Sequence, residues 1–397
     1  MSRPPAGARA MTRAVRLSRN VVLLGVVSML ADVSGDMVMP LLPAFLVTLG
    51  ADAAFIGAIE GTAEATSALL KYLSGRWADR VRRLRPLATL GYALAVFARP
   101  FLAFARVPWH VLLIRNVDRV GKGIRTSPRD KLLAASAPRE RLAEAFAFHR
   151  GMDHAGAALG PLVAAALLAV WPDDLRRVFL VAAIPGTLAV FALFAVREEP
   201  VDPAAVPEPA GSKRAPAPLL GAIALFTLGN STDALLILRA GTLGVPTGQL
   251  PLLWALLHVV RALFSWPVGR AADRLGRKRA LIAGWIWYAA CYAGFALATA
   301  AWHAWVLFGA YGLVAALTEG AERALIADAA TSGSRGRALG LYNLITGVGL
   351  LAASVLAGQI WERVSPGAAL LVGAVLALAA SVLLAASRPA DEQAPAV

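Results

Sequence analysis

The chain is 397 residues long, with 58% hydrophobic and only 16% charged residues, and its formal net charge is +14. Soluble globular proteins carry about 25% charged residues, so this composition, with a mean hydropathy of +0.62, excludes an ordinary soluble domain. Apolar stretches of roughly 20 residues recur along the chain, and each can cross a bilayer as a helix. Because lipid offers no hydrogen-bond partners, these stretches must be helical, since barrel strands would be shorter and alternating. We therefore predict an all-α membrane protein.

The first apolar stretch follows a basic segment, residues 1–20, that holds five arginines. This stretch is too long for the hydrophobic region of a secretory leader and contains Asp32 and Asp36, so we expect it to remain as the first span. The single cysteine, Cys291, lies within an apolar stretch, which excludes disulfides and cysteine-based metal sites. We predict twelve transmembrane helices, near residues 21–48, 54–74, 86–105, 108–130, 142–170, 176–196, 218–243, 250–270, 279–301, 303–326, 337–360 and 366–387.

Twelve spans divide evenly into two pseudo-symmetric six-helix halves. Between the sixth and seventh spans lies a proline-rich segment, which is typical of a linker. The predicted organisation is a basic cytoplasmic N-terminus (1–20), a first half (21–196), a cytoplasmic linker (197–217), a second half (218–387) and a cytoplasmic tail (388–397).

Arginine and lysine residues gather in alternate loops. The N-terminus, the linker and the loops at 76–85, 125–141, 270–279 and 323–337 are basic, whereas the intervening loops hold few cations. The cation-rich side of a membrane protein faces the cytoplasm, so both termini are expected inside a bacterial cytoplasmic membrane. This distribution explains the positive charge as a topology signal and argues against nucleic acid as a partner. We expect a monomer in the lipid bilayer.

One short pattern, Gly-x-x-Ala-Asp-Arg, begins at Gly75 and again at Gly269. Each copy follows the second span of its half and opens a run of basic residues. A repeat at this distance indicates two related halves. The copies differ at one position, because the second continues with Gly276 where the first has Arg82.

With these loops and its two six-span halves, the chain resembles the major facilitator superfamily. That family's loop signature is Gly, three residues, Asp-Arg, one residue, Gly and two basic residues. Segments 32–43, 60–66 and 119–130 are similar to one widespread bacterial branch of the family. The resemblance covers essentially the whole chain and implies a transporter that works by alternating access, moves a small-molecule substrate and needs no cofactor.

The repeated loop is the predicted conformational latch. Asp79 and Asp273 follow long helices, where a carboxylate can meet the backbone N–H groups of a neighbouring helix. Such a contact can hold one conformation and open in another. The alternative is a tight basic turn that only sets topology. The predicted latch residues are Gly75, Asp79, Arg80, Gly269, Asp273, Arg274, Gly276 and Arg277.

Charged and titratable residues also lie inside the predicted spans. Each charge near the bilayer centre costs about 2.5–3.5 kcal/mol on insertion scales, so each needs a partner or a role. Helical spacing of three and four places several of them on common helix faces. We predict that they line a polar cavity for proton coupling and substrate: Asp32, Asp36, Glu60, Glu64, Arg115, Asp118, Arg119, Lys122, His149, Arg150, Asp153, Asp233, Arg261 and Glu319.

Within this set Asp36 and Glu64 are the preferred proton carriers, because an acid among apolar groups holds its proton more readily than one in water. Arg119 is the expected partner that senses their charge. Arg119-x-x-Lys122 resembles the family's span-four motif, whose arginine is linked to proton transfer, with lysine in place of glutamine. His149 can titrate near neutral pH as well. The alternative is a set of static salt bridges, although buried pairs add little net stability.

Gly156, Gly160 and Pro161 form a pattern that allows close helix packing and a bend in the fifth span. It resembles the Gly-Pro motif of the family's proton-coupled exporters, with simple packing as the alternative. Several aromatic residues could stack on a substrate, but we predict a lipid-facing or interfacial place for them. These residues are Trp254, Trp285, Trp287, Tyr288 and Tyr311.

The function that follows is secondary active transport, without enzymatic activity. The sequence contains no Gly-x-x-x-x-Gly-Lys-Ser/Thr signature for ATP, so an ion gradient is the expected energy source. We favour proton-coupled export of a drug or metabolite. The alternatives are proton-coupled uptake of a metabolite or metal chelate and, more remotely, a membrane-embedded enzyme or a receptor. An enzyme would need motifs such as His-Glu-x-x-His or Gly-x-Ser-x-Gly, which the sequence lacks.

Overall fold

The computed structural model describes residues 17–138, 141–198, 217–328 and 335–387. Within these ranges the structure does not describe the side chains of some residues, namely 143, 217, 266, 269, 272, 273, 275, 327, 328 and 335–339. The predicted N-terminal segment, linker and tail therefore fall almost wholly outside the described residues. Every regular element in the described ranges is a helix.

The first half contains six spans, some of them built from consecutive helices. Prolines at Pro40, Pro43 and Pro100 interrupt or restart helices, because proline lacks the N–H that a continuous helix needs. The spans are α1 (Arg19–Val38) with η1 (Met39–Leu41) and α2 (Leu42–Thr48); α3 (Ala53–Ala78); α4 (Arg85–Ala98) with η2 (Arg99–Phe104); α5 (Pro108–Ala135); α6 (Leu142–Val170); and α7 (Leu175–Val181) with α8 (Ala183–Phe194).

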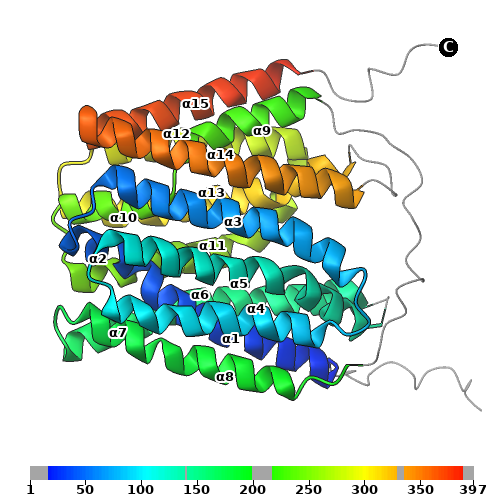
Figure 1. The fold of residues 1–397 in the computed structure, drawn as a ribbon. Coiled ribbons are helices and arrows are strands. Elements are labelled where there is room, and N and C mark those ends of the chain that lie inside the picture. Colours follow the sequence, from blue (N-terminus) through cyan, green and yellow to red (C-terminus); the bar gives the residue numbers. More distant parts are fainter. Residues whose placement is uncertain (1–16, 139–140, 199–216, 329–334, 388–397) are drawn as a thin grey trace, which may run out of the picture.

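The second half repeats this plan. Its seventh span is broken at residues 230–232, which are not helical. The spans are α9 (Ala217–Gly229) with α10 (Asp233–Thr242); α11 (Leu250–Leu275), entered through η5 (Thr247–Gln249); α12 (Arg277–Leu297); α13 (Ala301–Asp328); α14 (Arg335–Arg363); and α15 (Pro366–Ala386). In Figure 1 the helices α9, α12, α14 and α15 lie above the first half, whereas α10, α11 and α13 lie behind α3 and α5, and the helices of both halves run in roughly the same direction.

Ten of these spans are long and apolar enough to cross a membrane by composition alone. The other two are α3 and α5, which have 26 and 28 residues but carry several charges each. They pack against each other and against neighbouring spans within the bundle. The prediction of twelve membrane helices in two six-helix halves is confirmed.

The two halves are joined at one end of the bundle, which we call the outer end because the predicted basic loops lie at the opposite, inner end. Here Ala234 of α10 belongs to a buried apolar cluster with Met37 and Ile56 of the first half. The backbone N–H of Ala53, at the start of α3, donates to Glu362 of α14 at 2.7 Å. These contacts close the outer end between the halves.

At the inner end the apolar cluster that includes Val21, Leu132 and Leu193 contains described residues of the first half only. Helices α3 and α14 approach closely where glycine faces backbone. A Cβ atom on Gly358 would lie 2.6 Å from the Ala54 Cα atom. The halves thus share their tight seam along α3 and α14 and at the outer end.

Candidate functional site

A closed network of charges occupies the interior of the first half. Arg115 of α5 donates from Nε and Nη2 to both carboxylate oxygens of Glu60, at 2.6 and 2.8 Å, and from Nη1 to Asp118 at 3.2 Å. Arg99 completes the network by donating from Nε to Asp118 at 2.8 Å. All four side chains are buried. Each charge has an opposite partner, which is the condition for burying charge at tolerable cost.

Sequence reasoning missed Arg99, although it stands alone in an otherwise apolar span. Its Nη1 atom also donates to the Ala31 carbonyl oxygen at 3.0 Å and to Ser34 Oγ at 2.8 Å. An isolated arginine inside an apolar run was the available signal, because such a charge needs a buried partner.

Beside this network lies a more accessible ion pair. Arg119 Nη2 is 3.0 Å from Glu64 Oε1 and 3.9 Å from Glu60 Oε2. The Glu64 side chain is 30% exposed, against 2% for Glu60. Lys122 is half-buried one turn along α5 from Asp118, and no ion pair joins it to a carboxylate among the described side chains. The predicted common face of α5 thus divides into a buried part and an accessible part.

Asp36 occupies a different environment, because its partner comes from the other half. The indole Nε1 of Trp254, on α11, donates to Asp36 Oδ1 at 3.0 Å. Trp254 is buried and also stacks edge-on against His258 with 5.0 Å between ring centroids. Both ring nitrogens of His258 lack hydrogen-bond partners in the described structure. One hydrogen bond therefore crosses between the halves at a carboxylate that, among the described side chains, has no arginine or lysine within 4 Å.

The remaining first-half residues of the predicted set lie nearer the inner end. Asp32 is 3.7 Å from Arg125 Nη2. On α6, Asp153 lies one helical turn from His149, with 3.5 Å between Nδ1 and Oδ2, and 3.6 Å from the exposed Arg150. The structure thus separates this group from the Glu60 network.

In the second half, acids find aromatic partners. The Tyr311 hydroxyl donates to Asp233 Oδ1 at 2.8 Å. Glu322, which the predicted set did not include, accepts from Trp285 Nε1 at 3.2 Å and from the Tyr342 hydroxyl at 2.6 Å. The predicted pair of Arg261 and Glu319 forms an ion pair between α11 and α13.

Two further aromatic residues, Tyr288 and Tyr292, bind the backbone at the break between α9 and α10. The Tyr288 hydroxyl donates to the Gly229 carbonyl at 3.0 Å, and the Tyr292 hydroxyl donates to the Ser231 carbonyl at 3.3 Å. The backbone N–H of Thr232 donates to Ser354 Oγ at 3.1 Å. Non-helical backbone at membrane depth is tolerated when protein groups satisfy it in this way.

The predicted lipid-facing or interfacial place is therefore wrong for three of the five aromatic residues. Trp254, Trp285 and Tyr288 are buried, and Tyr311 is half-buried on Asp233, while Trp287 is 40% exposed. The physical reason is that tyrosine and tryptophan combine an apolar body with one polar group, which here finds a buried acceptor.

The two loop copies differ in shape. Gly276 alone separates α11 from α12 and has a φ of 95°, which favours glycine. Arg82, at the matching position, is not among the described residues with positive φ, and six residues separate α3 from α4. The copy with arginine is therefore a longer turn.

The carboxylate of Asp79 forms an ion pair with Lys131 at the inner end of α5. The N-terminus of α4 instead receives Glu198, whose Oε2 accepts from the Arg85 N–H at 3.1 Å. The expected contact between Asp79 and a helix N-terminus is thus replaced by a contact with a lysine. Arg80 and Arg274 are exposed, Arg277 begins α12, and Gly75 lies near Ser127. Gly269 and Asp273 lie in the last turns of α11, and the contacts of the Asp273 side chain lie outside the described part of the structure.

Gly156 and Gly160 place α6 directly against α1. A Cβ atom at Gly156 would lie 2.5 Å from the Met29 carbonyl oxygen, and one at Gly160 would lie 2.6 Å from that of Val33. Pro161 follows inside the continuous helix α6. This approach brings the α6 residues His149 and Asp153 close to α1.

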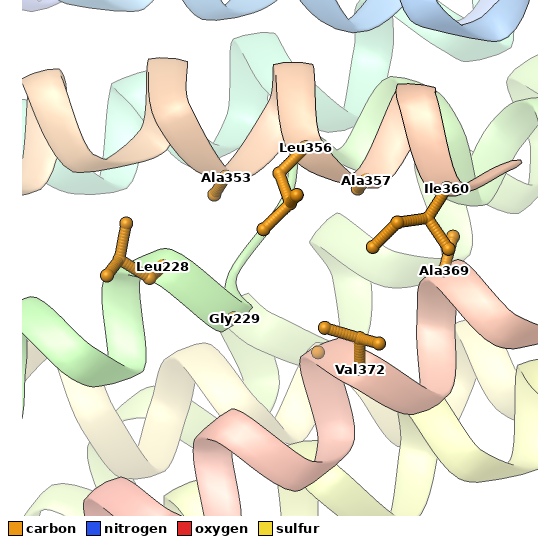
Figure 2. Close-up of a pocket in the computed structure, with 9 residues that line it drawn as sticks. Leu228, Gly229, Ala353, Leu356, Ala357, Ile360, Ala369 and Val372 are labelled. Atoms are coloured by element: carbon orange, nitrogen blue, oxygen red, sulfur yellow. The ribbon is translucent and has the colours of Figure 1, made fainter.

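Figure 2 shows a small pocket between α9, α14 and α15, with a volume of about 10 Å³. Its lining, including Leu228, Leu356, Ile360 and Val372, is apolar, so it is a gap in packing. Among the described residues no group of three or more His, Cys, Asp or Glu side chains could hold a metal ion. The candidate site is instead centred on Asp36, where the two halves meet, and on the accessible Glu64.

Comparison with known proteins gives a consistent result. The model of the Major Facilitator Superfamily matches residues 24–238 and 219–397. An uncharacterized MFS-type transporter of Methanocaldococcus jannaschii is 33% identical over 379 residues, covering 93% of this chain and 94% of that protein. An uncharacterized protein of Mycobacterium tuberculosis is 27% identical over 390 residues, with 93% of each chain covered.

Solved structures share the fold. A POT family transporter in complex with 5-aminolevulinic acid superposes with a TM-score of 0.77 at 11% identity, covering 93% of this chain and 96% of that one. The nucleoside transporter NupG superposes with a TM-score of 0.76 at 14% identity, covering 92% and 99%. At these identities the similarity concerns the fold alone.

Proposed function

Because the chain belongs to the major facilitator superfamily, a family of secondary transporters, we propose that it exports a small amphipathic molecule in exchange for protons. It does so by alternating access, with the two six-helix halves (21–196 and 218–387) moving about a site between them. We place it in a bacterial cytoplasmic membrane as a monomer, with both termini and the linker in the cytoplasm. The basic inner loops support this orientation.

The observation that carries the proposal is the hydrogen bond between Trp254 and Asp36. It is made at a carboxylate without an ion pair, and it joins the two halves. When the outer end opens, Trp254 withdraws with its half and Asp36 is left to take a proton from the outside. When the outer end closes, the indole N–H returns and favours the ionised carboxylate, which releases the proton inward. Proton entry thus accompanies one complete cycle.

The accessibility of other acids supports an inward-facing arrangement. The side chains of Glu64 and Glu319 are 30% and 50% exposed, although both lie within membrane helices. Apolar clusters join the halves at the outer end. Glu64, paired with Arg119, is the second proton carrier that we propose, and the other predicted cavity residues surround the substrate.

Flux measurements in proteoliposomes test this function. The exterior of the proteoliposomes is made acidic, and a panel of labelled amphipathic cations, neutral compounds and metabolites is present on both sides of the membrane. A dye in the lumen reports proton entry. We expect at least one compound to leave the lumen only when the gradient is present. Gradient-driven uptake instead would favour the importer, and no flux across the whole panel would contradict transport.

The variants Asp36→Asn and Glu64→Gln test the carriers. Asparagine still accepts from Trp254 but cannot exchange a proton, so Asp36→Asn is expected to abolish proton entry while exchange of labelled compound continues. Asp174→Asn, at the outer turn before α7, is the matched control and is expected to behave as the unmodified protein. Full gradient-driven transport by both site variants would remove them as carriers.

A further inference from the structure

Inward of Asp36, four helices of the first half enclose a second group of polar side chains. Asp32 of α1 lies 3.7 Å from Arg125 of α5. Arg129, one turn further along α5, donates to Ser28 Oγ at 3.2 Å. Helix α6 contributes His149 and Asp153, and α4 contributes Tyr92, whose ring lies 4.2 Å below the Arg125 guanidinium carbon. We call this group the inner polar cluster: Ser28, Asp32, Tyr92, Arg125, Arg129, His149 and Asp153.

Five atoms of the inner polar cluster are buried without a hydrogen-bond partner in the described structure. Tyr92 is 0% exposed and His149 only 2% exposed, so bulk solvent does not reach them. The five atoms are Tyr92 Oη, Arg125 Nε and Nη1, His149 Nε2 and Asp153 Oδ1.

Such groups are costly when left alone. A buried donor or acceptor without a partner costs about 1–3 kcal/mol, and more when it is charged. Another buried tyrosine shows the usual solution, because Tyr288 is 1% exposed and donates to the Gly229 carbonyl. The five atoms of the inner polar cluster are therefore available to bind an occupant that supplies hydrogen bonds.

The five atoms define the chemistry of this occupant. Arg125 offers N–H donors, Asp153 offers an acceptor, and the Tyr92 hydroxyl and His149 nitrogen can act in either sense. Two arginines face two aspartates, so the cluster needs no further charge. Water fits both requirements, because a buried water makes about three hydrogen bonds to otherwise unsatisfied groups.

We propose that buried water molecules fill the inner polar cluster and carry protons between Asp36 and the inner end of the bundle. Asp32 lies one helical turn inward of Asp36 on the same face of α1. Asp153 packs across from Asp32, since Gly156 brings α6 within contact of α1. His149 stands one turn further inward on α6 and is the last titratable group of the route. This inference rests on the proposed function, in which Asp36 exchanges a proton.

Charged and titratable groups on every neighbouring element face this route. Arg125 pairs with Asp32, Arg129 pairs with Asp130, and Arg150 lies 3.6 Å from Asp153, so the charges of the cluster and its immediate neighbours balance. The groups that face it are Asp36 on α1, Tyr92 on α4, Lys122, Arg125, Arg129 and Asp130 on α5, Arg150 and His154 on α6, and Arg261 on α11.

Hydroxyl-radical footprinting on the purified full chain tests for the water. X-ray pulses convert bound water to radicals that oxidise neighbouring tyrosine and histidine side chains. We expect Tyr92 and His149 to become oxidised despite their burial, and to retain ordinary oxygen after brief transfer into heavy-oxygen water. Tyr288 is the matched control, because it is equally buried but already hydrogen-bonded, and it is expected to stay unmodified. Equal protection of Tyr92, His149 and Tyr288 would overturn the water cluster.

Transient currents after a pH jump test the route, with everted membrane vesicles adsorbed on a solid-supported electrode. No transport substrate is needed, because proton binding inside the protein displaces charge. We expect Asp153→Asn to slow the current by about a hundredfold, the lower end of what a positioned proton-transfer group contributes. His149→Gln is expected to act in the same direction, and Arg106→Gln, at an exposed position of an outer loop, is expected to leave the rate unchanged.

Footprinting of the same variants checks that they fold. Currents at the unmodified rate in both Asp153→Asn and His149→Gln would overturn the route. A current that persists in Asp36→Asn would instead count against the proposed function, because Asp36 would then not be the group that the protons reach. The two failures are therefore distinguishable.

Discussion

The two halves of the molecule bury their acids with different partners. In the first half Arg99 holds Asp118, whereas in the second half Trp285 and Tyr342 hold Glu322. An arginine compensates only a carboxylate, so protonation of its partner leaves a buried cation without a counter-charge. An indole or phenol donor can keep its hydrogen bond whether the acid is ionised or neutral. The acids with aromatic partners are thus the ones whose charge can change at low cost.

Asp36 lies in the first half, but like the buried acids of the second half it is bound by an aromatic donor. Its donor, Trp254, comes from α11 of the second half. The carboxylate that can change its charge therefore lies where the two halves meet, which is where alternating access needs it. The following substitutions test this difference between the halves.

Removing Arg99 is expected to have the largest effect. Arg99→Met leaves Asp118 with one arginine and the Ala31 carbonyl and Ser34 hydroxyl without their donor. Breaking a buried pair destabilises by about 3–5 kcal/mol. Thermal unfolding in detergent measures this loss, with the exposed Arg106→Met as the matched control. Equal midpoints for the two variants would show that the first-half network is not structural.

Removing the hydroxyl of Tyr311 is expected to have a smaller effect. Tyr311→Phe deletes one hydrogen bond to Asp233, and a bond to a charged group contributes about 1.5–3 kcal/mol. The same unfolding measurement applies, with Tyr72→Phe as control because Tyr72 is 47% exposed. A loss as large as that of Arg99→Met would erase the distinction between the halves.

The loop copies provide the smallest expected effect. Gly276→Ala forces alanine into a positive φ where its Cβ would meet no atom beyond its chain neighbours within 4 Å, so the cost of about 1–3 kcal/mol is purely conformational. Arg82→Gly, at the matching position, is expected to change stability by no more than about 0.5 kcal/mol. Equal effects at the two positions would mean that the turns do not differ as described.

The sequence was sufficient to predict the fold and the position of each charged residue along its span. It was not sufficient to predict which charged residues pair with each other. Apolar length locates spans, and helical spacing places Asp32 and Asp36 on one face. The partners of Glu60 and Asp36 are 55 and 218 residues away, and helix packing alone decides which side chains meet at such separations. Aromatic residues were misplaced for the same reason, because a buried tryptophan and a lipid-facing one have the same sequence environment.

The break in the seventh span has a mechanical consequence. Inward of residues 230–232, α9 packs on α14 and α15 of its own half. Outward of them, α10 contacts α2 and α3 of the other half and is also held to its own half, where Arg239 donates to the carbonyl oxygens of Phe295 and Ala298. The backbone groups released at the break are already bound by Tyr288, Tyr292 and Ser354. Bending there sacrifices no helical hydrogen bond. The two segments of the span can therefore change their angle to each other while α9 stays on α14 and α15 and α10 stays on α12 of the same half.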